Sequence, residues 1–174
     1  MKKFLPVLFL FCFLTSASLA QVVLSGAQYS QDFDDINGEG LASGGTSSQL
    51  PLGWALYETG FRADNAYVAG TGGSSVPHTL SLGNGGSIER AFGTLRGTNF
   101  DDFASVIGSQ LENHTGGAIE GLQISYTGEQ WRSGDAGLVD RLLFYYSTDA
   151  TSLNDAGATW VEVPFTPGPT STWT

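Results

Sequence analysis

Short segments in which apolar and polar residues alternate, separated by turns, limit the fold of this chain most strongly. Within residues 121–126, Leu122, Ile124 and Tyr126 share one face, which is typical of a half-buried strand. Residues 159–165 alternate in the same way, whereas residues 142–146 form a continuous apolar run that predicts a strand buried on both faces. Weaker strands are expected at 79–82 and 87–92, around a turn at 83–86.

No segment after residue 20 has the spacing of a convincing amphipathic helix. Residues 100–111 match helical spacing in part, and they fit a loop followed by a strand equally well. The 24 glycines and the few charged residues exclude a long coiled coil. We therefore predict an all-β fold, an antiparallel β-sandwich of jelly-roll type.

The N-terminus has the three parts of a secretory signal peptide. Lys2 and Lys3 precede an apolar run over residues 4–14, and small residues end at Ala20, which predicts cleavage before Gln21. The run is shorter than the ~20 residues that span a bilayer, so we expect no membrane span. Cys12, the only cysteine, lies in this segment, so the remaining chain offers no disulfide or thiolate site. We expect a secreted bacterial protein, extracellular or at the cell surface.

The charge of the chain is strongly one-sided. Both lysines lie in the signal segment, which leaves five arginines against 17 acidic residues. Phosphate backbones are bound by positive surfaces, so we expect no direct binding of nucleic acid by this chain.

Five segments together resemble a known type of extracellular module. They are residues 29–34, 50–54, 83–93, 124–132 and 143–147, and the most specific is the Tyr-Thr-Gly-Glu-Gln-Trp-Arg run that ends at Arg132. Over residues 25–165 the chain resembles the lectin-like (concanavalin-like) jelly-roll module at the N-terminus of large secreted bacterial proteins. In that group the module precedes lamin-tail domains, extracellular endonuclease/phosphatase domains or a C-terminal sorting signal.

The resemblance also implies how the chain is organised. The family pattern continues with further strands after residues 160–163. We therefore expect a domain over residues 21–166 that is incomplete at its C-terminus, a loop or truncated end at 167–174, and downstream domains in the same protein. A sandwich without its last strands would expose unpaired edges.

Two groups of residues are candidates for binding. Glu129, Trp131 and Arg132 combine a carboxylate, an aromatic face and a cation, which suits a polysaccharide or cell-surface glycan: the indole stacks on a sugar ring and the polar groups bond its hydroxyls. The alternative is scaffold, with Trp131 in the core or at its rim and Arg132 paired with Glu129 or Asp140.

The second group is acidic. Asp32, Asp34 and Asp35 are candidate ligands of a structural Ca²⁺, a hard ion that prefers six to eight oxygens. The loop that begins at Asp35 has glycine at its sixth position, but Thr46 stands at the twelfth, where an EF-hand needs glutamate. The alternative is a solvated turn that follows an edge strand.

The sequence assigns no catalytic residues. It holds no Gly-x-Ser-x-Gly elbow and no His-Glu-x-x-His motif, and the only histidines, His78 and His114, are expected at the surface. We therefore predict a non-catalytic extracellular module that binds glycans or surfaces. The alternatives are a purely structural accessory domain preceding a secreted nuclease or phosphatase, and a glycoside hydrolase or lyase on a jelly-roll scaffold.

Overall fold

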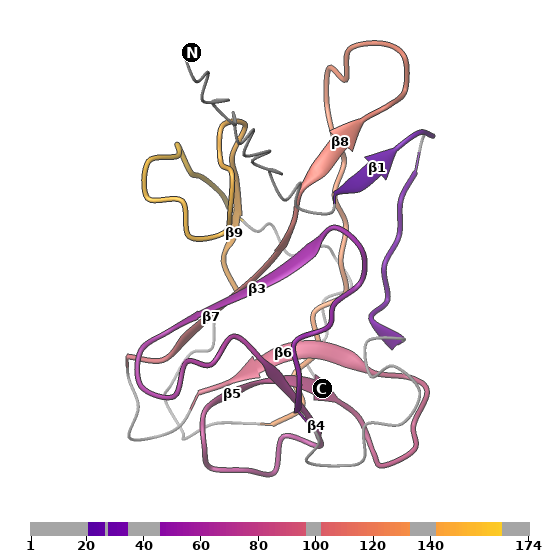
Figure 1. The fold of residues 1–174 in the computed structure, drawn as a ribbon. Coiled ribbons are helices and arrows are strands. Elements are labelled where there is room, and N and C mark those ends of the chain that lie inside the picture. Colours follow the sequence, from indigo (N-terminus) through magenta and orange to yellow (C-terminus); the bar gives the residue numbers. More distant parts are fainter. Residues whose placement is uncertain (1–20, 27, 35–45, 97–101, 133–141, 165–174) are drawn as a thin grey trace, which may run out of the picture.

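The computed structural model describes residues 21–26, 28–34, 46–96, 102–132 and 142–164. These residues form ten β-strands and no α-helix, which confirms the prediction of an all-β chain (Figure 1). Within them, no helix has the length and apolar character needed to cross a membrane. The signal predicted at residues 1–20 and the end predicted at 167–174 lie outside the described residues.

The largest sheet has four strands in the order β2-β4-β5-β6. Its strands are β2 (Thr46–Ser47), β4 (Tyr67–Gly70), β5 (His78–Leu82) and β6 (Ala91–Leu95). The turn predicted after β5 is present: the Ser87 N–H donates to the Asn84 carbonyl at 3.0 Å. Gly86 in this turn has a φ of 79°, a conformation that glycine adopts without steric cost.

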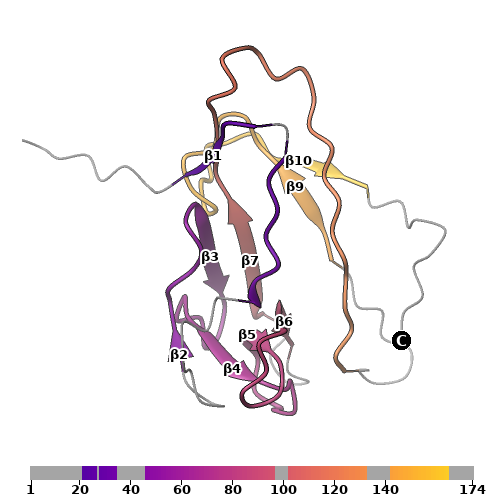
Figure 2. The same cartoon turned by 90° about the vertical axis from the view of Figure 1, so that its right-hand side faces the viewer.

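A second sheet pairs β3 (Trp54–Thr59) with β7 (Ala104–Ser109), antiparallel along their whole length. Residues 100–111 therefore contain a strand, and the partial helical spacing did not indicate a helix. Two further pairs join β1 (Val22–Leu24) to β8 (Leu111–Asn113) and β9 (Phe144–Tyr146) to β10 (Val161–Val163). Figure 2 shows β3 and β7 side by side, with β9 and β10 to one side of them.

The prediction of an antiparallel arrangement is right for only some of these pairs. β2–β4, β5–β6, β3–β7 and β9–β10 are antiparallel, whereas β4–β5 and β1–β8 are parallel. Alternation of apolar and polar residues identifies a strand and its buried face, but it carries no information on the partner or its direction. The described residues thus form several sheets compatible with a β-sandwich.

The core lies on the four-stranded sheet. Its buried apolar side chains are Tyr67, Ala69, Leu80 and Leu82 of this sheet, together with Val22 of β1 and Phe103, which precedes β7. Aromatic rings extend it toward the N-terminal segment: Phe33 meets Trp54 edge-on with centroids 4.7 Å apart and lies 5.3 Å from Phe92. Such contacts contribute beyond the area they bury, so residues 28–34 are held against β3 and β6.

Residues from 119 onward differ most from the expectation. No strand forms at 121–126, where Leu122 is 57% exposed. The run at 142–146 is not buried either, because Leu142 is 65% exposed and only Phe144–Tyr146 form a strand. At 159–165 the strand is confined to β10, whose side chains are exposed. Apolar residues favour strands, but burial needs a covering layer, and β9–β10 is only a two-stranded sheet.

Two aspartates organise the connection between β9 and β10. Asp149 Oδ1 accepts hydrogen bonds from the Ser147 hydroxyl (2.6 Å) and the Thr159 N–H (2.8 Å). Asp155 accepts from the N–H and hydroxyl of Thr151 and from the Gly157 N–H. These bonds favour the charged carboxylates and lower the pKa of both side chains. Residues 153–157 thereby form the turns of this connection.

Candidate functional site

Glu58, close to the end of β3, is a buried carboxylate with all its acceptor positions used. It is 3% exposed. Its Oε2 accepts the N–H groups of Asp64 and Asn65, both at 3.0 Å. Its Oε1 accepts the N–H of Thr79 at 3.2 Å and the Thr79 hydroxyl at 2.5 Å. Four donors fill the lone-pair sites of a carboxylate, which offsets much of the cost of burying it.

The loop that follows β3 folds back so that its N–H groups reach the Glu58 carboxylate. Gly60, Arg62 and Asn65 have positive φ values of 87°, 75° and 55°, which turn the chain back toward β3. Asn65 is clamped on both sides, because its Oδ1 accepts the Glu58 N–H at 2.9 Å while its own N–H donates to Glu58. The loop therefore presents Asp64 beside the first residue of β5.

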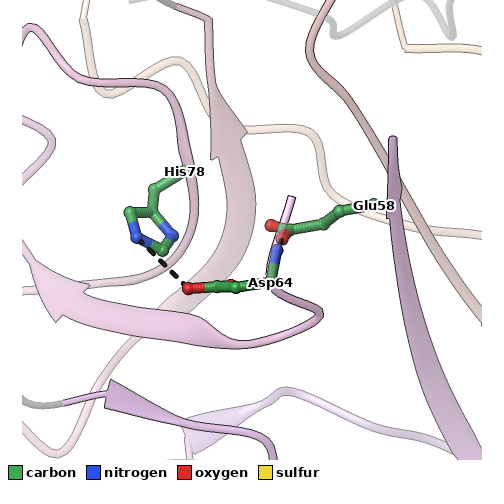
Figure 3. Close-up of side chains that lie close together, drawn as sticks. All are labelled: Glu58, Asp64 and His78. Atoms are coloured by element: carbon green, nitrogen blue, oxygen red, sulfur yellow. Dashed lines mark hydrogen bonds and ion pairs between the residues drawn. The ribbon is translucent and has the colours of Figure 1, made fainter. Parts of the chain in front are cut away.

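Glu58, Asp64 and His78 form a cluster (Figure 3). One potential ligand atom from each residue lies within 4.8 Å of those of the other two. His78 Nε2 is 4.0 Å from Asp64 Oδ2, with the His78 side chain 22% exposed and the Asp64 side chain 49% exposed. The cluster thus extends from the buried carboxylate of Glu58 to the solvent-exposed carboxylate of Asp64.

His78 carries an unusual polar atom. Its Nδ1 is buried and has no hydrogen-bond partner among the described residues. A buried polar group without a partner costs about 1–3 kcal/mol, and most such groups in proteins are satisfied. The expectation that His78 lies at the surface holds only in part, because His78 begins β5 and its side chain is 22% exposed. His114 matches the expectation: it is exposed and its Nε2 lies 2.9 Å from Glu112.

A chain of hydrogen bonds links the cluster to a third strand. The Thr79 hydroxyl, which bonds to Glu58, also lies 2.7 Å from the Ser105 hydroxyl on β7. Glu58, Thr79 and Ser105 therefore connect the β3–β7 pair to the four-stranded sheet. Thr79 is fully buried, so these hydrogen bonds belong to the scaffold beneath the cluster.

Sequence reasoning missed this cluster because its members come from one strand, the following loop and another strand. One signal was present in the pattern of β3. Trp54, Leu56 and Glu58 occupy alternate positions, and the structure shows all three at least partly buried. A carboxylate on the inward face of a strand needs hydrogen-bond donors or a cation beside it. The position of Glu58 in this alternation is therefore the signal that could have identified the site.

The predicted glycan-binding residues are only partly brought together. The Trp131 indole N–H donates to Glu129 Oε2 at 2.8 Å, and 37% of Trp131 is exposed. Arg132 turns elsewhere: its Nη1 donates to the carbonyl of Ser74, in the connection between β4 and β5, at 2.7 Å. Of the scaffold alternative, the described residues show no ion pair between Arg132 and Glu129, while the partial exposure of Trp131 is compatible with a place at the rim of the core; Asp140 lies outside the described residues.

The predicted calcium ligands lie in the segment that carries Phe33. Asp34 Oδ1 accepts the backbone N–H of Arg90 at 2.8 Å, and Asp32 Oδ1 accepts the Asp34 N–H at 3.2 Å. Asp35 lies outside the described residues. These bonds anchor the segment to the start of β6, and a calcium site at Asp32, Asp34 and Asp35 stays a prediction from the sequence.

The chain was compared with protein-family models, curated proteins and solved structures, and none of them matches it. Function must therefore be inferred from the residues described above.

Proposed function

We propose that this chain is a non-catalytic extracellular module, built on a jelly-roll-type sandwich, that attaches a larger secreted bacterial protein to a polysaccharide or surface glycan. The observation that carries the proposal is the exposed Trp131 ring, fixed by its hydrogen bond to Glu129. Secretion is supported by the signal-like segment at residues 1–20.

Trp131 and Glu129 together suit a sugar. The indole offers an apolar face that can stack on the C–H face of a pyranose ring. Its N–H is already bonded to Glu129, so the ring is oriented before a ligand arrives and less rotamer freedom is lost on binding. The carboxylate beside it accepts hydrogen bonds from sugar hydroxyls.

Arg132 holds this platform against the rest of the fold. Its bond to the Ser74 carbonyl joins residues 129–132 to the connection between β4 and β5. Residues 129–132 are thereby tied to the loop between β4 and β5, although residues 120–132 form no strand.

Replacement of Trp131 by alanine is expected to weaken polysaccharide binding at least about tenfold, the loss of about 1.4 kcal/mol of stacking. The measurement is affinity electrophoresis of the chain through gels that contain soluble polysaccharides of different linkage. Trp160→Ala is the matched control. Trp160 is 38% exposed, and its indole N–H donates to a backbone carbonyl, that of Asp155, at 3.1 Å.

Retardation that Trp131→Ala abolishes and Trp160→Ala leaves intact would support the proposal. If both variants migrate as the parent chain does, the ligand does not use Trp131. If no polysaccharide retards the parent chain, the structural accessory domain becomes the better interpretation. Release of reducing sugar by the chain would instead favour the hydrolase or lyase alternative.

A further inference from the structure

We propose that His78 and Asp64, backed by the charge of Glu58, bind a divalent transition-metal ion of the Zn²⁺ class. The site is distinct from the glycan platform and from the predicted calcium ligands. It lies where the loop after β3 meets the start of β5.

The donor set selects the kind of ion. Imidazole nitrogen together with carboxylate oxygen suits Zn²⁺, Ni²⁺ and Cu²⁺, whereas Ca²⁺ and Mg²⁺ prefer oxygen alone. With His78 neutral, two carboxylates supply the two negative charges that balance a divalent cation. The chain has no cysteine after residue 20, so a thiolate site of higher affinity cannot compete.

The distances assign different roles to the two carboxylates. His78 Nε2 and Asp64 Oδ2 are 4.0 Å apart, which is too long for a hydrogen bond. Two ligand bonds of about 2.1 Å can bridge that gap. Glu58 already accepts four hydrogen bonds. It therefore acts as a fixed buried charge beneath the ion, and water completes the coordination shell on the exposed side of Asp64.

The unpartnered Nδ1 of His78 is the second ring nitrogen at this site, since Nε2 is the atom that lies 4.0 Å from Asp64. The described protein provides no donor or acceptor for this buried nitrogen. Metal-bound histidines normally bond their second nitrogen to a carboxylate, carbonyl or water, and a water that enters with the ion would supply that bond.

The test uses the two histidines of the chain as internal references. The full chain is titrated with ZnCl₂ while the imidazole resonances of His78 and His114 are followed by NMR. We expect the His78 resonances to shift or broaden at a stoichiometry of one ion per chain. The His114 resonances should stay unchanged, although His114 also faces a carboxylate, that of Glu112, at 2.9 Å.

The variants separate binding from folding. His78→Gln should remove the stoichiometric binding, and Asp64→Asn, at an exposed side chain, should weaken it at least tenfold in isothermal titration. His114→Gln should leave the affinity unchanged, and CaCl₂ should not displace the ion. The proposal is overturned if Zn²⁺ shifts both histidines equally, if Asp64→Asn binds as the parent does, or if His78 does not respond at millimolar Zn²⁺.

Discussion

Replacement of Glu58 by glutamine should lower the free energy of unfolding by about 3–5 kcal/mol. The change keeps the size of the side chain, so it leaves no cavity. It turns one terminal oxygen into an NH₂ group, and every position around the carboxylate is already occupied by a donor from Asp64, Asn65 or Thr79. An NH₂ group in place of Oε2 would face the N–H groups of Asp64 and Asn65, and one in place of Oε1 would face the Thr79 N–H, so either orientation opposes at least one backbone donor. Urea unfolding monitored by circular dichroism measures the effect.

Glu120→Gln is the matched control for this substitution. Glu120 is exposed, so the same loss of charge should change the stability by less than about 0.5 kcal/mol. Equal effects of the two substitutions would show that Glu58 contributes only through net charge. In that case the four hydrogen bonds to Glu58 would not support the fold.

Replacement of Gly60 by alanine should destabilise the chain by about 3 kcal/mol or more, since two separate costs combine at this position. Gly60 has a φ of 87°, which L-residues with a side chain rarely adopt. A Cβ there would also lie 2.1 Å from the Asp102 carbonyl oxygen and 2.5 Å from its carbon. Both atoms belong to the backbone just before β7, so relief requires moving the chain that pairs with β3.

Gly116→Ala separates the two costs. Gly116 has a similar φ of 81°, but a Cβ there meets nothing within 4 Å. Only the backbone strain of about 1–2 kcal/mol should remain. Thermal unfolding of the two variants gives the difference directly. If Gly60→Ala costs no more than Gly116→Ala, the close approach of the β3 loop to Asp102 is not present in solution.

The strands from 54 to 109 could be predicted in part, because there the patterns of residue type and burial agree. Residues 79–82 read as a strand, and β5 buries Leu80 and Leu82 on the core. Its parallel pairing with β4 could not be predicted, since no local pattern encodes a partner. From residue 119 onward the patterns were just as strong, and Leu122 and Ile124 are nevertheless exposed. Alternation indicates where a strand could be buried, while burial itself depends on a neighbouring layer.

Of the candidate sites, one could be predicted from the sequence and the other could not. Glu129 and Trp131 could be paired from the sequence because they are two residues apart, and the structure joins them by a hydrogen bond. The cluster of Glu58, Asp64 and His78 could not, because its geometry depends on the reversed loop at 60–66 and on the place of β5. The sequence around His78 gives no sign of a metal site, whereas the structure brings His78 close to the carboxylates of Glu58 and Asp64.

Native-state hydrogen exchange of the Asn65 and Thr79 amides tests most directly whether Glu58 organises this fold. Both N–H groups donate a hydrogen bond to the buried Glu58 carboxylate. Asn65 lies in the loop after β3 and is not part of a strand. We expect both amides to exchange only through global unfolding, with protection equal to that of Leu80 and Leu82 in β5. Exchange of Asn65 and Thr79 as rapid as that of residues 121–126 would contradict the central role of Glu58.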